Sequence, residues 1–281
     1  NMDYGYTPLA HAYGLGHHRA TADPVMLMYR GDYYLFSTNQ GGYWWSENLQ
    51  DWHFVKHSFL TEETQKEEDL CAPAAWVQDD KLYVFGSTYT PDFPIWVSTD
   101  PKNGKWEKAV EKLAIGGWGA GFFFLIWDPA FFVDDDGRLY MYNGSSNVYP
   151  IYGVELDAKT FEPKGERKPL LSCNGEQIGW HRFGEYLDNT FLAPFIEGAW
   201  MTKHNGKYYM QWGGPGTEFS HYADGVAVGD SPLGEFRHLP LPLSMKAGGF
   251  IRGAGHGSTF QDKWGNYWHV STMAVSVKNN F

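Results

Sequence analysis

A unit that recurs five times along the chain limits its possible folds more than any other feature of the sequence. Each unit has an apolar run, a polar turn and a second run rich in Leu, Tyr and Phe. Because alternating runs flank a turn that contains Gly, Asp or Asn, each unit predicts a β-hairpin. The five units span residues 22–38, 72–88, 127–145, 197–212 and 256–272.

Shorter apolar runs follow most of these hairpins and extend each unit to four predicted strands. Residues 43–46 precede Trp52 in this way, and Ile95–Asp100 precede Trp106. Four strands per unit, repeated about every 50 to 70 residues, are typical of propeller blades. A β-sandwich has a similar density of strands, but it does not explain five copies in register. The sequence therefore predicts an all-β, five-bladed propeller in which residues 1–281 form a single domain.

The fifth unit is shorter than the others. Nine residues follow Thr272, too few for two further strands, whereas earlier units use about 30 or more for that half. We therefore expect an incomplete fifth blade. Either the N-terminal segment closes the ring or the chain is a fragment of a longer protein, and we favour the fragment.

Composition limits the class of partner. The formal charge is −11, and no run of Lys or Arg is present, which argues against nucleic acid because such binding depends on neutralising phosphates. No stretch reaches the roughly 20 apolar residues of a membrane helix. Aromatic residues make up 18% of the chain. Most are expected to pack the core, but flat aromatic rings also stack on sugars. A neutral carbohydrate is therefore a better partner than nucleic acid or a membrane.

Aligning the hairpins on their turns brings several polar residues to one repeat position. Counting back nine residues from three turn glycines reaches Asp128, Glu197 and His256, and counting back eight from Gly31 reaches Asp23. In a propeller the first strand of each blade lines the central channel, so these side chains are expected to meet at one rim. The second unit has Ala72 at this position.

Three carboxylates at one repeat position predict a catalytic site. A lone Asp before Pro is usually a turn residue. Carboxylates that crowd together among apolar neighbours instead raise one another's pKa, an arrangement that is costly unless a function needs it. Glycoside hydrolysis needs one protonated and one ionised carboxyl group. The pattern therefore favours a glycosidase.

Four motifs carry a resemblance to a known family. ADP at 22–24, WDPAFF at 127–132, EGAW at 197–200 and GHGSTF at 255–260 resemble glycoside hydrolase family 43 in order and spacing. The resemblance implies that Asp23 is the general base, that Asp128 orients and tunes the acid, and that Glu197 is the general acid. It also implies inverting, exo-acting hydrolysis of plant cell-wall glycans, most often of α-L-arabinofuranosides or β-D-xylosides. No cofactor is required for that chemistry.

Further residues are candidates for binding. His256 matches a family position that often holds a metal near the channel axis, here a possible structural calcium, although a buried hydrogen-bonded histidine is equally compatible with the sequence. Arg252 could pair with a site carboxylate or lie on the surface. The predicted substrate-binding residues also include three on the loop after the first hairpin and one in an extra segment, 179–188: Gln40, Trp44, Trp45 and Trp180.

Two other functions remain open. One is a glycan-binding propeller without catalysis, which would keep the aromatic residues but would not need aligned carboxylates. The other is a related five-bladed glycosidase with a different sugar specificity. The sequence starts at Asn1 without a charged and then apolar leader, so we expect that any signal peptide has been removed or was never included. An extracellular or periplasmic location is therefore expected from the predicted function alone.

Overall fold

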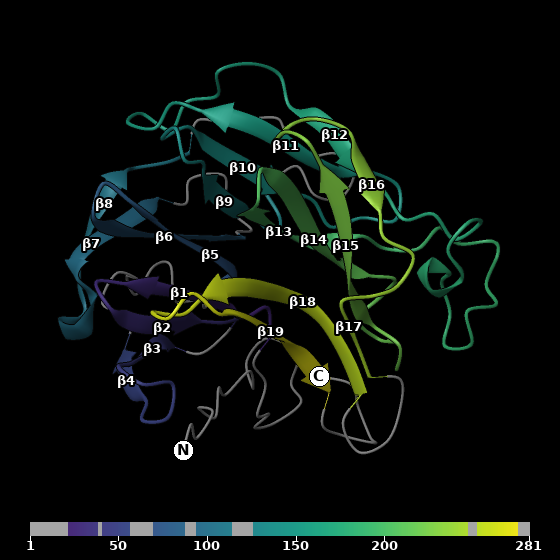
Figure 1. The fold of residues 1–281 in the computed structure, drawn as a ribbon, viewed down its shortest axis with the longest axis horizontal. Helices are drawn as coiled ribbons and strands as arrows, with labels where there is room; N and C mark the ends of the chain where they lie inside the picture. The colour runs from purple at the N-terminus through teal and green to yellow at the C-terminus, as the bar shows by residue number, and fades with distance from the viewer. Residues whose placement is uncertain are drawn as a thin grey trace.

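The structure is a computed structural model that describes residues 22–38, 41–56, 70–87, 94–113, 126–246 and 252–274. These residues form five β-sheets arranged around a common centre (Figure 1). Helix in the described residues is limited to two short 3-10 turns, η1 (Pro101–Asn103) and η2 (Gly179–His181). The expected all-β class is therefore confirmed.

The first two sheets are four-stranded antiparallel blades. The first contains β1 (Val25–Tyr29), β2 (Asp32–Phe36), β3 (Gly42–Ser46) and β4 (His53–Lys56). The second contains β5 (Cys71–Gln78), β6 (Lys81–Ser87), β7 (Ile95–Asp100) and β8 (Lys105–Val110).

The third and fourth sheets repeat this order, and the fifth is smaller. The third contains β9 (Ala130–Val133), β10 (Leu139–Asn143), β11 (Ile151–Leu156) and β12 (Lys168–Leu171). The fourth contains β13 (Glu197–His204), β14 (Lys207–Gly214), β15 (Ala223–Gly229) and β16 (Phe236–His238), and β17 (Ser244–Met245) also pairs with β15. The fifth contains β18 (Arg252–Gln261) and β19 (Tyr267–Ala274).

The first strands of the sheets form a closed inner ring. β1 contacts β5, β5 contacts β9, β9 contacts β13, β13 contacts β18, and β18 contacts β1 again. Figure 1 shows the same strands nearest the centre, with the later strands of each sheet further out. Of the five predicted blades, four are complete and the fifth is a two-stranded sheet within the described residues. The single-domain boundary at 1–281 stays a prediction.

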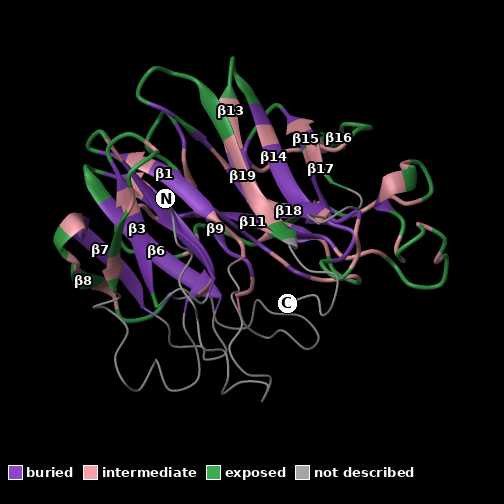
Figure 2. Ribbon diagram, turned by 90° about the horizontal axis from the view of Figure 1, so that it is seen from below, coloured by how far each residue is buried: buried purple, intermediate pink, exposed green. Residues whose placement is uncertain are grey.

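Aromatic and aliphatic side chains fill the spaces between neighbouring sheets. Trp76 of β5 stacks on Phe131 of β9 with ring centroids 4.0 Å apart, which joins the second blade to the third. Trp212 of β14 is completely buried in a cluster that includes residues of the third and fourth blades. Figure 2 shows buried residues along the strands and exposed ones mostly at the turns. Most of the aromatic composition is therefore used in packing, as expected.

The inner strands share a distortion where they begin. Pairing in β5, β13 and β18 shifts register near the first residues of the strand, as in a β-bulge. One residue at this position has a positive φ in every blade: 53° at Asp23, 40° at Ala72, 49° at Asp128, 59° at Gly198 and 50° at His256. Bulges re-aim side chains and are frequent beside active sites. Because Ala72 has the same conformation without a polar side chain, the bulge is part of the architecture.

This conformation corrects one step of the sequence alignment. Counting back from the turn placed Glu197 at the repeat position of Asp23, Asp128 and His256, but the structure places Gly198 there. Glu197 lies one residue earlier and pairs with Gly213 before the bulge. The count was wrong by one because the turn of the fourth hairpin is shorter than those of the third and fifth.

Candidate active site

The predicted catalytic residues lie together at the rim of the inner ring. Asp23 precedes β1, Asp128 precedes β9, and Glu197 begins β13. Burial is the main cause that raises the pKa of Asp128 and of Glu197, and the neighbouring charges add to it: Glu197 and Asp23 act on Asp128, and Asp23 acts on Glu197. The side chain of Asp128 is 5% exposed and that of Asp23 is 17% exposed, so Asp23 is the more accessible of the two.

His256 is the positive partner of this cluster. Its Nδ1 lies 3.1 Å from Oδ1 of Asp23 and 3.8 Å from Oδ2 of Asp128. Burial opposes a charged imidazole, but the surrounding carboxylates of Asp23, Asp128 and Glu197 outweigh it and raise the pKa of His256 to about 9. At neutral pH the ring is therefore an imidazolium that neutralises part of the carboxylate charge.

Glu197 is held by two hydroxyl groups. Tyr222 donates a hydrogen bond of 2.6 Å to Oε1, and Ser145 donates one of 2.9 Å to Oε2. Burial raises the pKa of Glu197, and the hydrogen bond from Tyr222 acts in the opposite direction. A buried carboxyl group with a raised pKa keeps its proton to a higher pH than an exposed one does. Glu197 therefore has the environment of a general acid.

Asp23 is fixed by a different set of contacts. Thr38 donates a hydrogen bond of 2.6 Å to Oδ2, while Oδ1 faces His256. The backbone N–H of Asp23 donates to the hydroxyl of Thr272 at 2.8 Å. A general base must be reached by a water molecule, and Asp23 is more exposed than Asp128. Asp23 therefore has the environment of a general base.

The same kind of hydroxyl contact recurs between successive blades, and sequence analysis missed it. The N–H of Ala72 donates to Thr38 at 2.8 Å, and that of Asp128 donates to Ser87 at 2.7 Å. Thr272 accepts from the N–H of Asp23 in the same way, whereas the hydroxyl of Ser145 donates to the carboxylate of Glu197. A Ser or Thr at the end of the second strand of one hairpin thus fixes the rim residue of the next blade. The recurring Ser or Thr at residues 38, 87, 145 and 272 was the available signal.

The predicted metal role of His256 does not fit the residues present. Calcium is bound by oxygen ligands, whereas His256 offers a ring nitrogen that already faces Asp23. Within the six described ranges, no group of three His, Cys, Asp or Glu side chains is arranged to hold a metal ion. The geometry is that of an ion pair between His256 and the carboxylates, so we derive no chemical step from a calcium ion.

The predicted substrate-binding tryptophans of the first blade are not on a loop. Trp44 and Trp45 lie within β3, so that placement was wrong. Trp44 is buried and packs against Phe54, with ring centroids 5.0 Å apart. Trp45 stacks on His53 at 4.4 Å. Both rings are used for packing within the blade. Gln40, predicted beside them, lies outside the described residues.

The other two predicted binding residues lie near the fourth blade. Trp180 in η2 stacks on Trp212 with ring centroids 5.2 Å apart, and its Nε1 donates to the carbonyl of Pro240. Arg252 begins β18 and donates from its guanidinium to the hydroxyl of Ser220 at 3.2 Å. Because of these contacts, Trp180 supports the packing of the fourth blade and Arg252 joins β18 to the segment before β15.

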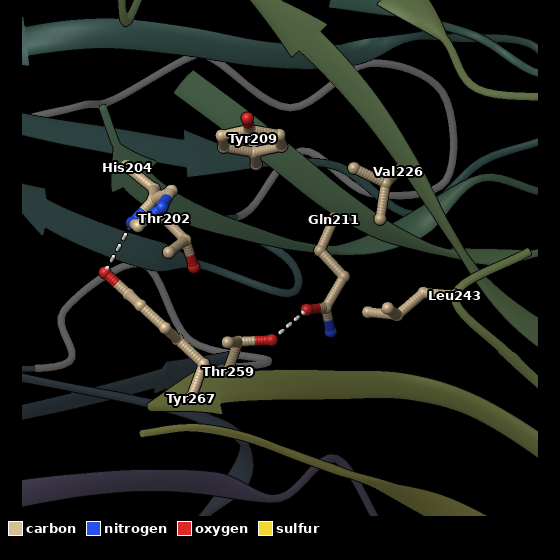
Figure 3. A pocket seen from close by; sticks show the side chains of 8 residues that line it. All are labelled: Thr202, His204, Tyr209, Gln211, Val226, Leu243, Thr259 and Tyr267. Carbon is tan, nitrogen blue, oxygen red and sulfur yellow. Dashed lines mark hydrogen bonds between the residues drawn. The ribbon is translucent and has the colours of Figure 1, made fainter. Parts of the chain in front are cut away.

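A pocket of about 350 Å³ is lined by residues of the fourth and fifth sheets and of the segment between them (Figure 3). His204 and Tyr267 meet across it through a contact of 3.3 Å, near the turns of their hairpins. Asp23, Asp128 and Glu197 do not line it. The lining residues are Thr202, His204, Tyr209, Gln211, Val226, Leu243, Thr259 and Tyr267.

The fold is a β-propeller, and its buried acidic rim brings together carboxyl groups in different environments, as acid–base hydrolysis of a glycoside requires. The family model for "Glycosyl hydrolases family 43" matches residues 18–280, so the chain belongs to this family.

Several known proteins are similar to this chain. It is 32% identical over 143 residues to a β-xylosidase of Xylanibacter ruminicola, an alignment that covers 43% of this chain and 42% of that protein. It is 31% identical over 198 residues to an arabinoxylan arabinofuranohydrolase of Paenibacillus polymyxa, covering 67% of this chain and 28% of that protein. The matches thus span less than half the length of these relatives.

The solved structures agree with the fold. A thermostable family-43 glycoside hydrolase superposes with a TM-score of 0.71 at 24% identity, covering 93% of this chain and 86% of that one. The propeller architecture is therefore shared with known members of the family.

None of the described helices is long and apolar enough to cross a membrane.

Proposed function

We propose that the chain is an inverting, exo-acting glycoside hydrolase that removes α-L-arabinofuranosyl or β-D-xylosyl units from plant cell-wall glycans. The observation that carries the proposal is the buried cluster in which Glu197, Asp128 and Asp23 share one imidazolium, His256. The names of the β-xylosidase and arabinofuranohydrolase relatives support the choice of sugar. Residues 1–281 would form one catalytic propeller domain, and its partner would be an oligosaccharide or polysaccharide.

The proposed step uses two carboxyl groups. Glu197 gives its proton to the glycosidic oxygen as the bond from that oxygen to the anomeric carbon breaks. Asp23 takes a proton from a water molecule, whose oxygen forms the new bond to the anomeric carbon from the opposite face. The products are a free sugar of inverted configuration and the shortened glycan. Glu197 ends ionised and Asp23 protonated, so one proton exchange with solvent resets both.

Asp128 supports this step without touching the transferred proton. Burial raises its pKa, and the charge of Glu197 acts in the same direction, so it carries a proton near neutral pH. A neutral Asp128 adds no repulsion when Glu197 becomes negative during turnover. We therefore assign Asp128 to charge balance, and the orienting and tuning role that the family resemblance implies stays a prediction.

The test is hydrolysis of nitrophenyl α-L-arabinofuranoside, β-D-xyloside and galactofuranoside by the purified protein. We expect turnover of one of the first two, with the inverted anomer as the first product in a proton NMR time course. Retention of configuration would exclude the proposed mechanism. Binding of xylan or arabinoxylan without turnover of any glycoside would instead support a non-catalytic glycan-binding propeller. Secretion, expected from such substrates, is tested separately by locating the protein in its source cells.

A further inference from the structure

Asp224 in β15 is the least exposed carboxylate among the described residues, with 0% of its surface accessible. The proposed reaction does not use it. A buried carboxylate is costly unless hydrogen bonds or a cation compensate for the lost hydration. The contacts of Asp224 therefore indicate which role this buried carboxylate has.

The carboxylate of Asp224 connects the fourth blade to the two-stranded fifth sheet. Oδ1 accepts a hydrogen bond of 3.2 Å from the N–H of Gly257 in β18. Oδ2 lies 3.0 Å from Nε2 of His269 in β19. Both strands of the fifth sheet are thus held by one side chain of the neighbouring blade.

His269 is oriented by a second contact. The hydroxyl of Ser244 lies 3.1 Å from Nε2 of His269 and donates its own hydrogen to the carbonyl of Ala254 at 2.8 Å. Since that hydrogen is already used, Nε2 must carry the hydrogen in this contact. The same nitrogen lies 3.0 Å from Oδ2 of Asp224, and the contact between His269 and the carboxylate is a close polar contact without hydrogen-bond geometry.

At the other blade interfaces this position is occupied by a hydroxyl. Ser87 and Thr272 pair with Cys71 and Gly255 at the ends of their hairpins, and their hydroxyls accept from the rim residue of the next blade. The corresponding residue of the fourth hairpin is Gly213, which pairs with Glu197 and has no side chain. Asp224, the β15 partner of Gly213, supplies an acceptor one residue further on, for the N–H of Gly257 that follows the rim residue His256.

The backbone that Asp224 holds belongs to the site. Gly257 directly follows His256, whose Nδ1 lies 3.1 Å from Asp23. A Cβ at Gly257 would stand 2.1 Å from the carbonyl of Val270 and 2.6 Å from Oδ2 of Asp224, so only glycine allows this close approach. A shift of this bulge would displace the imidazolium from Asp23.

We propose that Asp224, oriented by His269, is a positioning residue that fixes the bulge of β18 so that His256 keeps Asp23 aligned for water activation. The inference rests on the proposed function. Misplacing a reacting group by about 1 Å can cost 10²-fold in rate, so a positioning role predicts a loss in kcat.

The test compares Asp224→Ala with Asp224→Asn. Asp224→Ala should lower kcat about 10- to 100-fold with little change in KM, because the acceptor for Gly257 is lost. Asp224→Asn should recover most of this activity, since the amide oxygen can accept the same hydrogen bond. His269→Gln, a second variant in case Asp224→Ala does not fold, should fall between them. Asp262→Asn, a buried aspartate at the turn of the same hairpin, is the matched control and should leave kcat unchanged.

Equal kcat losses in Asp224→Asn and Asp224→Ala, or a loss confined to KM, would overturn the positioning role. A crystal structure of Asp224→Ala gives a readout independent of turnover, in which His256 should move away from Asp23. If wild type hydrolyses no glycoside but His256 moves as expected, the proposed function fails and the structural link stands. An unmoved His256 refutes the link in either case.

Discussion

The two ends of β9 carry aspartates in opposite electrostatic states. Asp128 precedes the strand at the channel rim, and burial together with the neighbouring carboxylates raises its pKa. Asp134 follows the strand at the turn, where hydrogen bonds from Lys203 and Tyr208 overcome its burial and lower its pKa. Both side chains are buried, so burial alone does not separate a candidate catalytic carboxylate from a structural one. The difference is what surrounds each group.

The fifth sheet repeats the turn-end pattern. Asp262 follows β18 as Asp134 follows β9, and each accepts the N–H of the turn glycine on its backbone carbonyl. Burial opposes ionisation of Asp262, but Trp268 and Asn266 donate to its side chain and lower its pKa to about 2. Donors thus surround carboxylates at the turn end, whereas at the rim end carboxylates outnumber the single imidazolium. At the rim the environment therefore disfavours ionised aspartates, whereas at the turns it stabilises them and so contributes to the stability of the fold.

The largest expected effect comes from removing the acid or the base at the rim. Glu197→Gln and Asp23→Asn should each lower kcat about 10²–10⁴-fold. Loss of the acid should matter less for a nitrophenyl glycoside, whose leaving group needs little protonation, than for a xylo-oligosaccharide. Loss of the base should affect both substrates alike. Steady-state kinetics on the two substrates measure this, and near wild-type turnover of both by either variant would contradict the assignment.

Asp128→Asn should lower kcat, but it should also make the stability of the protein less sensitive to a rise in pH. The unfolded chain titrates this group near 3.8, whereas burial raises its folded pKa to about 8. The folded state therefore binds more protons between these values, and wild-type stability falls as pH rises through this window. Asp128→Asn has no such proton to lose, so its unfolding temperature should fall less from pH 5 to pH 8. Parallel curves for both proteins would refute the raised pKa.

Asp134→Asn should have the reverse outcome, with stability lost and activity kept. It weakens the ion pair with Lys203 and the hydrogen bond of 2.6 Å from Tyr208. Weakening such buried contacts costs about 1–3 kcal/mol. Because the wild-type pKa is lowered, this stability should be present above the unfolded pKa and disappear as pH falls below it. Urea unfolding at pH 7 and pH 3 measures the effect, and a loss of kcat at 25 °C would break the contrast between rim and turn.

The smallest effect is expected at an exposed ion pair. Arg30 at the first turn contacts Asp80 at the second, with side chains 48% and 69% exposed. Solvent screens such pairs, and many contribute nothing measurable. Arg30→Gln should therefore change neither the unfolding temperature nor kcat beyond experimental error. A clear loss of either would show that this exposed ion pair contributes to stability or to activity, against the expectation.

The sequence predicted the hairpins correctly and brought three carboxylates to one rim, because both follow local rules. The catalytic roles of these carboxylates stay predictions. Alternation and turn residues determine a hairpin within about 15 residues, and the repeat brings the start of every inner strand to one rim. The prediction of loop tryptophans failed for a related reason. Trp44 and Trp45 have the pattern of a strand as well as the chemistry of a sugar platform, and packing against Phe54 and His53 was invisible without the next strand.

What the sequence alone determined is thus the repeat, the class of fold and the residues that reach the rim. Tertiary structure decided which partner each rim residue meets: His256 beside Asp23, Tyr222 on Glu197, and Asp224 where a hydroxyl would otherwise stand. It also placed Gly198, not Glu197, in the bulge of the fourth blade. The physical reason is that pKa and orientation depend on atoms within a few ångströms, and here those atoms come from different blades that only the closed ring brings together.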